Sequence, residues 1–467
     1  MKRKDFLKLT GTVATGLALS GNTLTAVASP YNGLMTVLRG GKTFYQNKWQ
    51  TLDIGIDASG KLKIGVLNSL TAPEVIDTTG KIVSPGFIDI LADNTANPEK
   101  TYTIFEKYKV ADGVTTALQM HGGSPDTAAY YRKFGAVPHV INYGVSTFVM
   151  RVRYRTNSLA ERKKQVEKCL EEGALGVSHS IEYQPTPYEE VMEYAKLAKK
   201  YDRPLFLHLR YSSSADELNG VEEAIRLARE SGARVHIDHL HSTGGTFHME
   251  EALRKIKSAN AQDVKMTCCV YPYSFWATYL HSTRFGDGWQ QRYGITYNDL
   301  RLVGTGERLT KESFAKYKEM RKLVAVPEGT LPLDKTVDLA LKEDFCMIGS
   351  DGGIEYAAQA NSHPRGAGCF STSIRHCLDI GMPLEKALDK VTTMQHHLIS
   401  PALKDRGIIA DGAWADLTVF DSTRIKARAT VENPNQFSDG IDVVYVNGKV
   451  AFKNGKLLNS NGVGIKY

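Results

Sequence analysis

PLFLHLR at residues 204–210, VHIDHL at 235–240 and FCMIGSD at 345–351 are short apolar runs that carry His208, His239 and Asp351 at or near their ends. Apolar runs of this length, bounded by polar residues, predict buried strands. In a (β/α)8 barrel the C-terminal ends of the strands are where ligands and catalytic acids gather. Two imidazoles and one carboxylate at such ends predict a metal site that supports hydrolysis.

Further runs of the same kind extend this pattern along the chain. The predicted strands are Ile82–Ile90, Thr115–Met120, His139–Val145, Ala174–Ser180, Leu205–Leu209, Arg234–Leu240, Lys265–Tyr271 and Phe345–Ser350. Helical patterns lie between most of them; in residues 159–173, Leu159, Val166 and Leu170 fall near one face and Gly173 is a stop signal. Eight strands alternating with helices favour an α/β fold of the (β/α)8, TIM-like barrel type over an open sheet.

The sequence pattern at both ends of the chain differs from the pattern in the middle. Residues 31–82 and 408–467 contain short strands separated by Gly-Lys, Ser-Gly and Asn-Gly turns. They predict a small β-sandwich domain built from both chain ends, around a barrel at residues 83–407. A gap of about 70 residues between the last two predicted strands predicts a lid or substrate-shaping insertion at 281–340.

Composition excludes several classes of protein. The 467 residues are 42% hydrophobic and 23% charged, as in ordinary globular proteins, and no Lys/Arg run accompanies the net charge of +7. We therefore expect no nucleic-acid partner. No run of 18 apolar residues predicts a membrane span. The six cysteines lack metal-finger spacing and are interpreted as buried free thiols, although a long-range disulfide stays open.

Residues 1–28 have the pattern of an export signal. A basic start, MKRKDFLK, precedes the weakly apolar LTGTVATGLALSG, and residues 26–28, AVA, offer a cleavage site. Arg3-Lys4 in this context is similar to a twin-arginine signal whose second arginine is lysine, and a Sec signal is the alternative. The expected location of the mature protein is periplasmic or secreted.

Eight segments in one order resemble the amidohydrolase superfamily, and most closely its N-acyl-D-amino-acid deacylase (D-aminoacylase) branch. They are IVSPGFID at 82–89, GVTT at 113–116, GALGVSHSIEYQPT at 173–186, HLR at 208–210, DHLH at 238–241, VYPYSFWAT at 270–278, SDGG at 350–353 with HPRGAG at 363–368, and DRGIIADGAWADLTVFD at 405–421. Each is weak alone, but together they span nearly all of residues 35–455.

The resemblance implies a zinc-dependent hydrolase that cleaves a carbon–nitrogen amide bond other than a peptide bond. By position, His208 and His239 match the metal ligands and Asp351 matches the general acid/base. Arg365 matches the residue that pairs with the carboxylate of a small-molecule substrate, and Tyr183 matches a substrate-contacting tyrosine. The oligomeric state cannot be read from the sequence.

Three positions depart from the family pattern. The histidine pair of the first strand falls on Leu91 and Asp93, the bridging Cys or Glu falls on Gly122, and a lysine after the second-histidine motif falls on His241. A site for one ion rather than two is therefore expected. Its third ligand stays open, and the candidates are His121, His179, Asp93 and Asp351.

The departures also leave two other functions open. One is a barrel that has lost its metal and binds a small acidic ligand without hydrolysing it. The other is a metal-free lyase or isomerase that uses histidine and aspartate as acid and base. Metal content separates both from the hydrolase.

Overall fold

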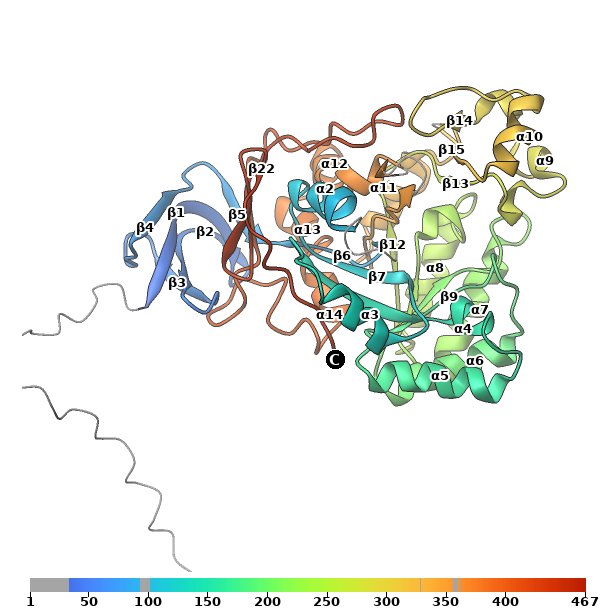
Figure 1. The fold of residues 1–467 in the computed structure, drawn as a ribbon, viewed down its shortest axis with the longest axis horizontal. Coiled ribbons are helices and arrows are strands. Elements are labelled where there is room, and N and C mark those ends of the chain that lie inside the picture. Colours follow the sequence, from blue (N-terminus) through green and yellow to red (C-terminus); the bar gives the residue numbers. More distant parts are fainter. Residues whose placement is uncertain (1–32, 93–100, 328, 356–359, 362) are drawn as a thin grey trace, which may run out of the picture.

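A computed structural model describes residues 33–92, 101–327, 329–355, 360–361 and 363–467 (Figure 1). The predicted export signal at 1–28 and the candidate ligand Asp93 lie outside the described residues. The described chain forms a barrel, a separate β-sheet domain and an insertion that projects from the barrel on the side away from that domain.

Eight parallel strands in chain order form the barrel. They are β6 (Phe87–Asp89), β7 (Val114–Ser124), β8 (Asn142–Phe148), β9 (Val177–Ser180), β10 (Leu205–His208), β11 (Val235–Ile237), β12 (Met266–Val270) and β16 (Cys346–Ile348). Each overlaps one of the eight predicted strands, so the predicted TIM-like barrel is confirmed. Side chains that alternate along these strands fill the interior, which includes Ile88, Leu118, Met120, Phe206 and Met347.

A polar cluster holds the seam between the first and last barrel strands. Lys109 Nζ lies 2.7 Å from Asp89 Oδ2, and both side chains are buried. The backbone N–H of Ser350 donates to Asp89 Oδ1 at 3.0 Å, and an isolated bridge pairs Ala92 with Gly352. Side-chain bonds therefore help to close the barrel between β6 and β16, which form no ladder with each other in the described chain.

The predicted strand Ile82–Ile90 is in fact two strands in two sheets. β5 (Ile82–Pro85) pairs with β19 (Leu417–Phe420) of the small domain, whereas β6 pairs with β7 of the barrel. Gly86 lies between them, and a Cβ atom there would sit 2.1 Å from the side chain of Thr115. The change of partner requires this close approach, which only glycine permits.

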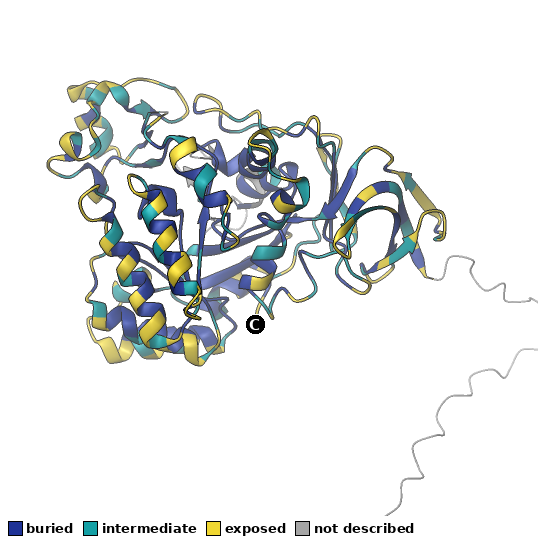
Figure 2. Cartoon of the chain, turned by 180° about the vertical axis from the view of Figure 1, so that it is seen from behind, coloured by how far each residue is buried: buried dark blue, intermediate teal, exposed yellow. Residues whose placement is uncertain are grey.

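Helices cover the outside of the barrel. They are α2 (Lys107–Ala111), α3 (Thr127–Phe134), α4 (Val149–Arg153), α5 (Leu159–Glu171), α6 (Tyr188–Lys200), α7 (Glu217–Ser231), α8 (Met249–Asn260), α11 (Val337–Leu341), α12 (Arg365–Asp379), α13 (Leu384–Asp389) and α14 (Thr393–Leu398). Figure 2 shows one buried and one exposed face along the longer ones.

Helix α5 illustrates how local sequence sets these boundaries. Ser158 caps its first turn by accepting a hydrogen bond from the backbone of Glu161, and the chain turns at Gly173, whose φ is +97°. Val166 and Leu170 are buried as predicted. Leu159 is exposed instead, because the first helical position precedes the stretch that packs on the barrel.

The small domain is a nine-stranded, mostly antiparallel sheet, which confirms the prediction of a separate β domain built from both chain ends; its strands form one sheet rather than the two of a sandwich. Its strands are β1 (Leu34–Tyr45), β2 (Lys48–Asp57), β3 (Leu62–Val66), β4 (Glu74–Asp77), β5, β19, β20 (Ile441–Val446), β21 (Lys449–Lys453) and β22 (Lys456–Leu457). They run in one continuous sheet, and side chains of β1, β2, β19 and β20 share one buried cluster. The sheet therefore curls around its own core.

The last residues of the chain return to the barrel. The backbone of Tyr143 exchanges hydrogen bonds with Val463 and Ile465, at 3.0 and 2.7 Å. Ile465 joins the apolar cluster inside the barrel. The guanidinium of Arg203 stacks on the ring of Tyr467 with 3.2 Å between them. These residues cover the N-terminal ends of the barrel strands.

The insertion has a small sheet and a core of its own. β13 (Ala277–Tyr279), β14 (Arg301–Leu302) and β15 (Leu323–Ala325) pair antiparallel, beside α9 (Trp289–Tyr293) and α10 (Lys311–Glu319). Its buried cluster includes Trp276, Phe285, Trp289 and Phe314. After β16, β17 (Ile354–Glu355) pairs antiparallel with β18 (Ala360–Asn361).

In the part of the chain that the structure describes, none of the helices has the length and apolar character to cross a membrane. The six cysteines are free and buried.

Candidate metal centre

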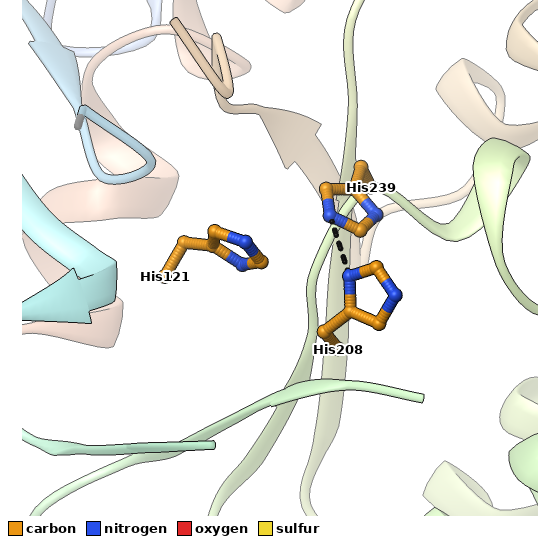
Figure 3. Close-up of side chains that lie close together, drawn as sticks. All are labelled: His121, His208 and His239. Atoms are coloured by element: carbon orange, nitrogen blue, oxygen red, sulfur yellow. Dashed lines mark hydrogen bonds between the residues drawn. The ribbon is translucent and has the colours of Figure 1, made fainter. Parts of the chain in front are cut away.

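Three histidines meet at the C-terminal ends of the barrel strands (Figure 3). His121 on β7, His208 on β10 and His239 after β11 each offer one ring nitrogen, and these nitrogens lie within 4.8 Å of one another. His208 Nδ1 is 3.2 Å from His239 Nε2. The three rings thus surround one point, with His121 facing the other two.

Local backbone geometry sets each ring in place. His208 is the last residue of β10. His239 stands two residues beyond β11 and has a φ of +29°, a left-handed conformation that non-glycine residues seldom adopt. Asp351 has a φ of +48° after β16. Rare backbone conformations of this kind gather at functional sites.

His121 reaches the site through an irregularity in β7. Neighbouring residues of a regular strand point to opposite faces, but β7 has a shift of register between Gln119 and Ser124, the stretch that contains His121. Gly123 within that stretch has a φ of +112°, and a Cβ atom there would lie 2.4 Å from the carbonyl oxygen of Ser146. The bulge breaks the alternation of side chains and redirects the imidazole.

A polar partner meets one ring nitrogen of each histidine. His121 Nδ1 lies 2.8 Å from Asp238 Oδ2, and His208 Nε2 lies 2.8 Å from Glu182 Oε2. His239 Nδ1 lies 3.1 Å from the hydroxyl of Ser242. His208 and His239 turn their other ring nitrogens, Nδ1 and Nε2 respectively, toward each other.

Burial keeps His208 and His239 neutral. It lowers the pKa of His208 to about 4, although Glu182 opposes the shift, and it lowers the pKa of His239 well below the usual value. Burial acts to raise the pKa of Glu182, but Arg284, His208 and Ser212 outweigh it and the pKa is lowered. A carboxylate and neutral imidazoles are the forms that bind metal ions.

Asp351, Arg365 and Tyr183 line the same cavity, whose volume is about 520 Å³. Arg365 Nη2 lies 2.7 Å from Asp351 Oδ2, and the guanidinium stacks on the ring of Tyr271 at 4.6 Å. Tyr183 packs against His208 with 4.8 Å between the ring centres. Burial raises the pKa of Tyr183, so its phenol stays protonated at neutral pH.

The structure does not bring every candidate to the three histidines. His179 pairs in register with Leu207, the neighbour of His208, and therefore faces away from the centre of the barrel. Its Nε2 contacts the hydroxyl of Thr186 at 2.7 Å. Asp351 stands in the cavity wall but pairs with Arg365. Leu91 is completely buried in the barrel interior, where it is packed among apolar side chains.

Four polar residues of the site were not found from the sequence: Glu182, Asp238, Ser242 and Arg284. Asp238 and Glu182 stand next to His239 and Tyr183 in segments that we had already singled out. Their position beside these candidate residues is the one feature of the sequence that could have identified Asp238 and Glu182. Arg284 lies in the insertion, for which the sequence shows no motif, and only the fold places it beside Glu182.

The donor set fits a zinc ion. Imidazole nitrogens are common zinc ligands, and two that bind one tetrahedral ion lie about 3.3 Å apart, given zinc–nitrogen bonds of about 2.0–2.1 Å. The observed separation between His208 and His239 is 3.2 Å. Carboxylate or hydroxyl partners on the opposite ring nitrogens are also typical of histidines that bind metals.

Comparisons with known proteins place this geometry in a family context. A model of the amidohydrolase family matches residues 318–452. The N-acyl-D-glutamate deacylase of Alcaligenes xylosoxydans xylosoxydans is 27% identical over 447 residues, which cover 86% of this chain and 89% of that protein.

Two solved structures share the fold. One is the N-acyl-D-glutamate deacylase of Bordetella bronchiseptica with zinc and a phosphonate inhibitor, with a TM-score of 0.78, 23% identity and coverage of 93% of this chain and 100% of that one. A D-aminoacylase described as having a binuclear metal centre has a TM-score of 0.76, 21% identity and the same coverage. The resemblance to the D-aminoacylase branch of the amidohydrolases is confirmed.

Proposed function

We propose that this chain, which resembles the N-acyl-D-amino-acid deacylases along most of its length, is a metal-dependent hydrolase of an amide bond in a small molecule. The observation that carries the proposal is the convergence of His121, His208 and His239 within 4.8 Å at the mouth of the barrel. Zinc held there supplies a Lewis acid for the amide carbonyl.

The site is proposed to hold one ion, although a related D-aminoacylase has a binuclear centre. Leu91 occupies an apolar, fully buried position where the family has a histidine, and Gly122 has no side chain to bridge two ions. His121, the residue before Gly122, offers a replacement for the lost bridging ligand.

Three cavity residues take the other roles. The carboxylate of Asp351 accepts a proton from the attacking water and returns it to the leaving nitrogen. Arg365 binds the carboxylate of the substrate, and its Nε and Nη1 atoms are buried without a protein partner in the described chain. The protonated phenol of Tyr183 donates a hydrogen bond to the substrate.

The substrate class follows from these roles and from the relatives. An N-acyl-D-amino acid combines the amide that the site would cleave with the carboxylate that Arg365 would bind. The cavity of about 520 Å³ matches the size range of small-molecule sites. Residues of β13 and β15 from the insertion line one wall and contribute to the choice of acyl group or side chain.

Metal content is the first test. The protein should contain about one zinc per chain after purification, and His121→Ala and His208→Ala should each remove it. His179→Gln is the matched control. His179 is as buried as His208 and lies on β9, the strand next to β10, yet it faces away from the site. Release of D-amino acids from N-acyl-D-amino acids, with L-isomers as the comparison, then tests the reaction. A folded protein that binds no zinc would overturn the proposal.

We also propose that the chain is exported by its first 28 residues. The basic start, the apolar stretch and the small residues at 26–28 support this proposal. Cell fractionation of the full chain and of an Arg3→Gln variant tests it. Loss of the processed periplasmic form in the variant supports a twin-arginine route, and unchanged export supports a Sec route. Wild-type protein that remains unprocessed in the cytoplasm contradicts both.

A further inference from the structure

Glu182 joins one metal-ligand candidate to the insertion. Its Oε2 atom lies 2.8 Å from His208 Nε2 and 3.1 Å from Nη2 of Arg284, and its Oε1 atom accepts a hydrogen bond from Ser212. Glu182 is 15% exposed and Arg284 is 4% exposed, so water screens this ion pair little. The carboxylate is therefore held from three sides.

The hydrogen bond to Glu182 decides which nitrogen His208 presents to the site. A carboxylate accepts but does not donate, so the proton of the neutral imidazole lies on Nε2. The lone pair then lies on Nδ1, the atom that faces His239 at 3.2 Å. Without the Glu182 carboxylate, nothing in the described chain would fix the proton of His208 on Nε2 or hold its ring in this orientation.

Arg284 also contacts Ser242, the hydrogen-bond partner of His239. Its Nη2 atom donates to the carbonyl oxygen of Ser242 at 3.0 Å, and the hydroxyl of Ser242 lies 3.1 Å from His239 Nδ1. One guanidinium thus contacts a partner of His208 and a partner of His239. It contacts neither imidazole itself.

The insertion fixes the position of Arg284. The neighbouring Phe285 belongs to the buried cluster of the insertion, beside Trp289 and Phe314. The guanidinium also packs on the ring of Trp276, 4.8 Å away. A segment outside the barrel therefore supplies the charge that orders two side chains at the mouth of the barrel.

We propose that Glu182 and Arg284 are positioning residues of the metal centre, through which the insertion holds His208 and His239 in ligand geometry. This inference rests on the proposed function, because it assumes that these histidines bind a metal ion. It assigns the insertion a second role besides lining the cavity: the affinity for metal depends on how the insertion is docked. Outer partners of this kind are worth about 10- to 100-fold in metal affinity.

The test compares zinc affinity, measured by competition with a chromophoric chelator, and the visible spectrum of the cobalt(II)-substituted protein. Glu182→Gln and Arg284→Met should each weaken zinc binding by about 10- to 100-fold and alter the cobalt spectrum. The double variant should lose much less than the product of the two losses, because the pair acts as one unit. Ser212→Ala, a milder change, should weaken binding in the same direction and serves if the other variants fail to fold.

Glu190→Gln is the matched control. Glu190 is also a buried carboxylate between two arginines, Arg153 and Arg162, but it contacts none of the three histidines. Its zinc affinity and cobalt spectrum should equal those of the wild type. Unchanged affinity in folded Glu182 and Arg284 variants, or an equal loss in Glu190→Gln, would overturn this inference alone. A wild-type protein without metal affinity would overturn the proposed function as well.

Discussion

Arg365 and Asp351 form an ion pair in the wall of the cavity, with Nη2 of the arginine 2.7 Å from Oδ2 of the aspartate. Two other nitrogens of the same guanidinium, Nε and Nη1, are buried and have no protein partner in the described chain. The arginine can therefore bind a substrate carboxylate while it still holds Asp351, and it would bring the substrate and the proton carrier together.

Arg365→Met should reduce kcat/KM for N-acyl-D-amino acids by about 10- to 150-fold, because a hydrogen bond to a charged group contributes about 1.5–3 kcal/mol. Steady-state kinetics measure the loss. A substrate whose carboxylate is replaced by a carboxamide provides the control: the variant should lose less activity on it than on the carboxylate substrate, because only the contact between Arg365 and Asp351 is then lost. An equal loss of kcat/KM for both substrates would mean that Arg365 does not bind the substrate carboxylate.

Asp351→Asn should lower kcat by about 10²- to 10⁴-fold, because an amide cannot carry the proton from water to the leaving nitrogen. Zinc content should stay at the wild-type level, since Asp351 pairs with Arg365 and stands apart from the three histidines. Metal analysis beside single-turnover kinetics separates the two effects. Loss of zinc in this variant would identify Asp351 as the metal ligand that the sequence left open.

His179 should make stability depend on pH. Burial, with help from Arg153 and Arg210, lowers its pKa from 6.5 to about 3. Below pH 6.5 this histidine is protonated in the unfolded chain but stays neutral in the native protein. Its contribution to the free energy of unfolding is therefore fully present above pH 6.5 and falls as the pH drops toward 3. Between pH 7.5 and 5 the loss from this one group is about 2 kcal/mol.

Urea unfolding of wild type and His179→Gln at pH 7.5 and pH 5.0 measures this contribution. The variant should lose about 2 kcal/mol less than the wild type between the two pH values, and the other buried histidines cancel in the difference. An equal pH dependence in both proteins would show that His179 titrates normally in the native state.

Lys109→Met should destabilise the protein by about 3–5 kcal/mol, because it leaves the buried carboxylate of Asp89 without its cation at the seam of the barrel. Chemical denaturation measures the change. Lys196→Met is the control: Lys196 pairs with Glu193 on the exposed face of α6, and its loss should cost at most about 1 kcal/mol. Similar effects of the two substitutions would rule out a special role for the seam.

The barrel could be predicted because each of its strands is an apolar run between polar segments. The place where Ile82–Ile90 divides could not, because both halves are equally apolar. Val83 pairs with Val419, whereas Phe87 pairs with Val114. The strand with which each half pairs is decided by contacts with distant segments. The local pattern of hydrophobicity does not predict it.

The histidines could be predicted for a related reason: His208 and His239 follow apolar runs, and position at a strand end is a local property. His121 required the bulge in β7, which depends on Gly123 and its close approach to Ser146. Glu182 and Arg284 are 102 residues apart in sequence, and only the path of the insertion brings them together. Ion pairs between such distant segments have no signature in a single sequence.

The order in which the ribosome makes this chain conflicts with the order in which its parts close. Ser84 of β5 contacts Thr418, a residue made 334 positions later, and Ile465 enters the barrel interior later still. Until then a nascent chain exposes the open edge of β5 and an unsealed barrel floor, both of which favour aggregation. Folding of the barrel and the small sheet can therefore finish only after residues 417–467 have been translated.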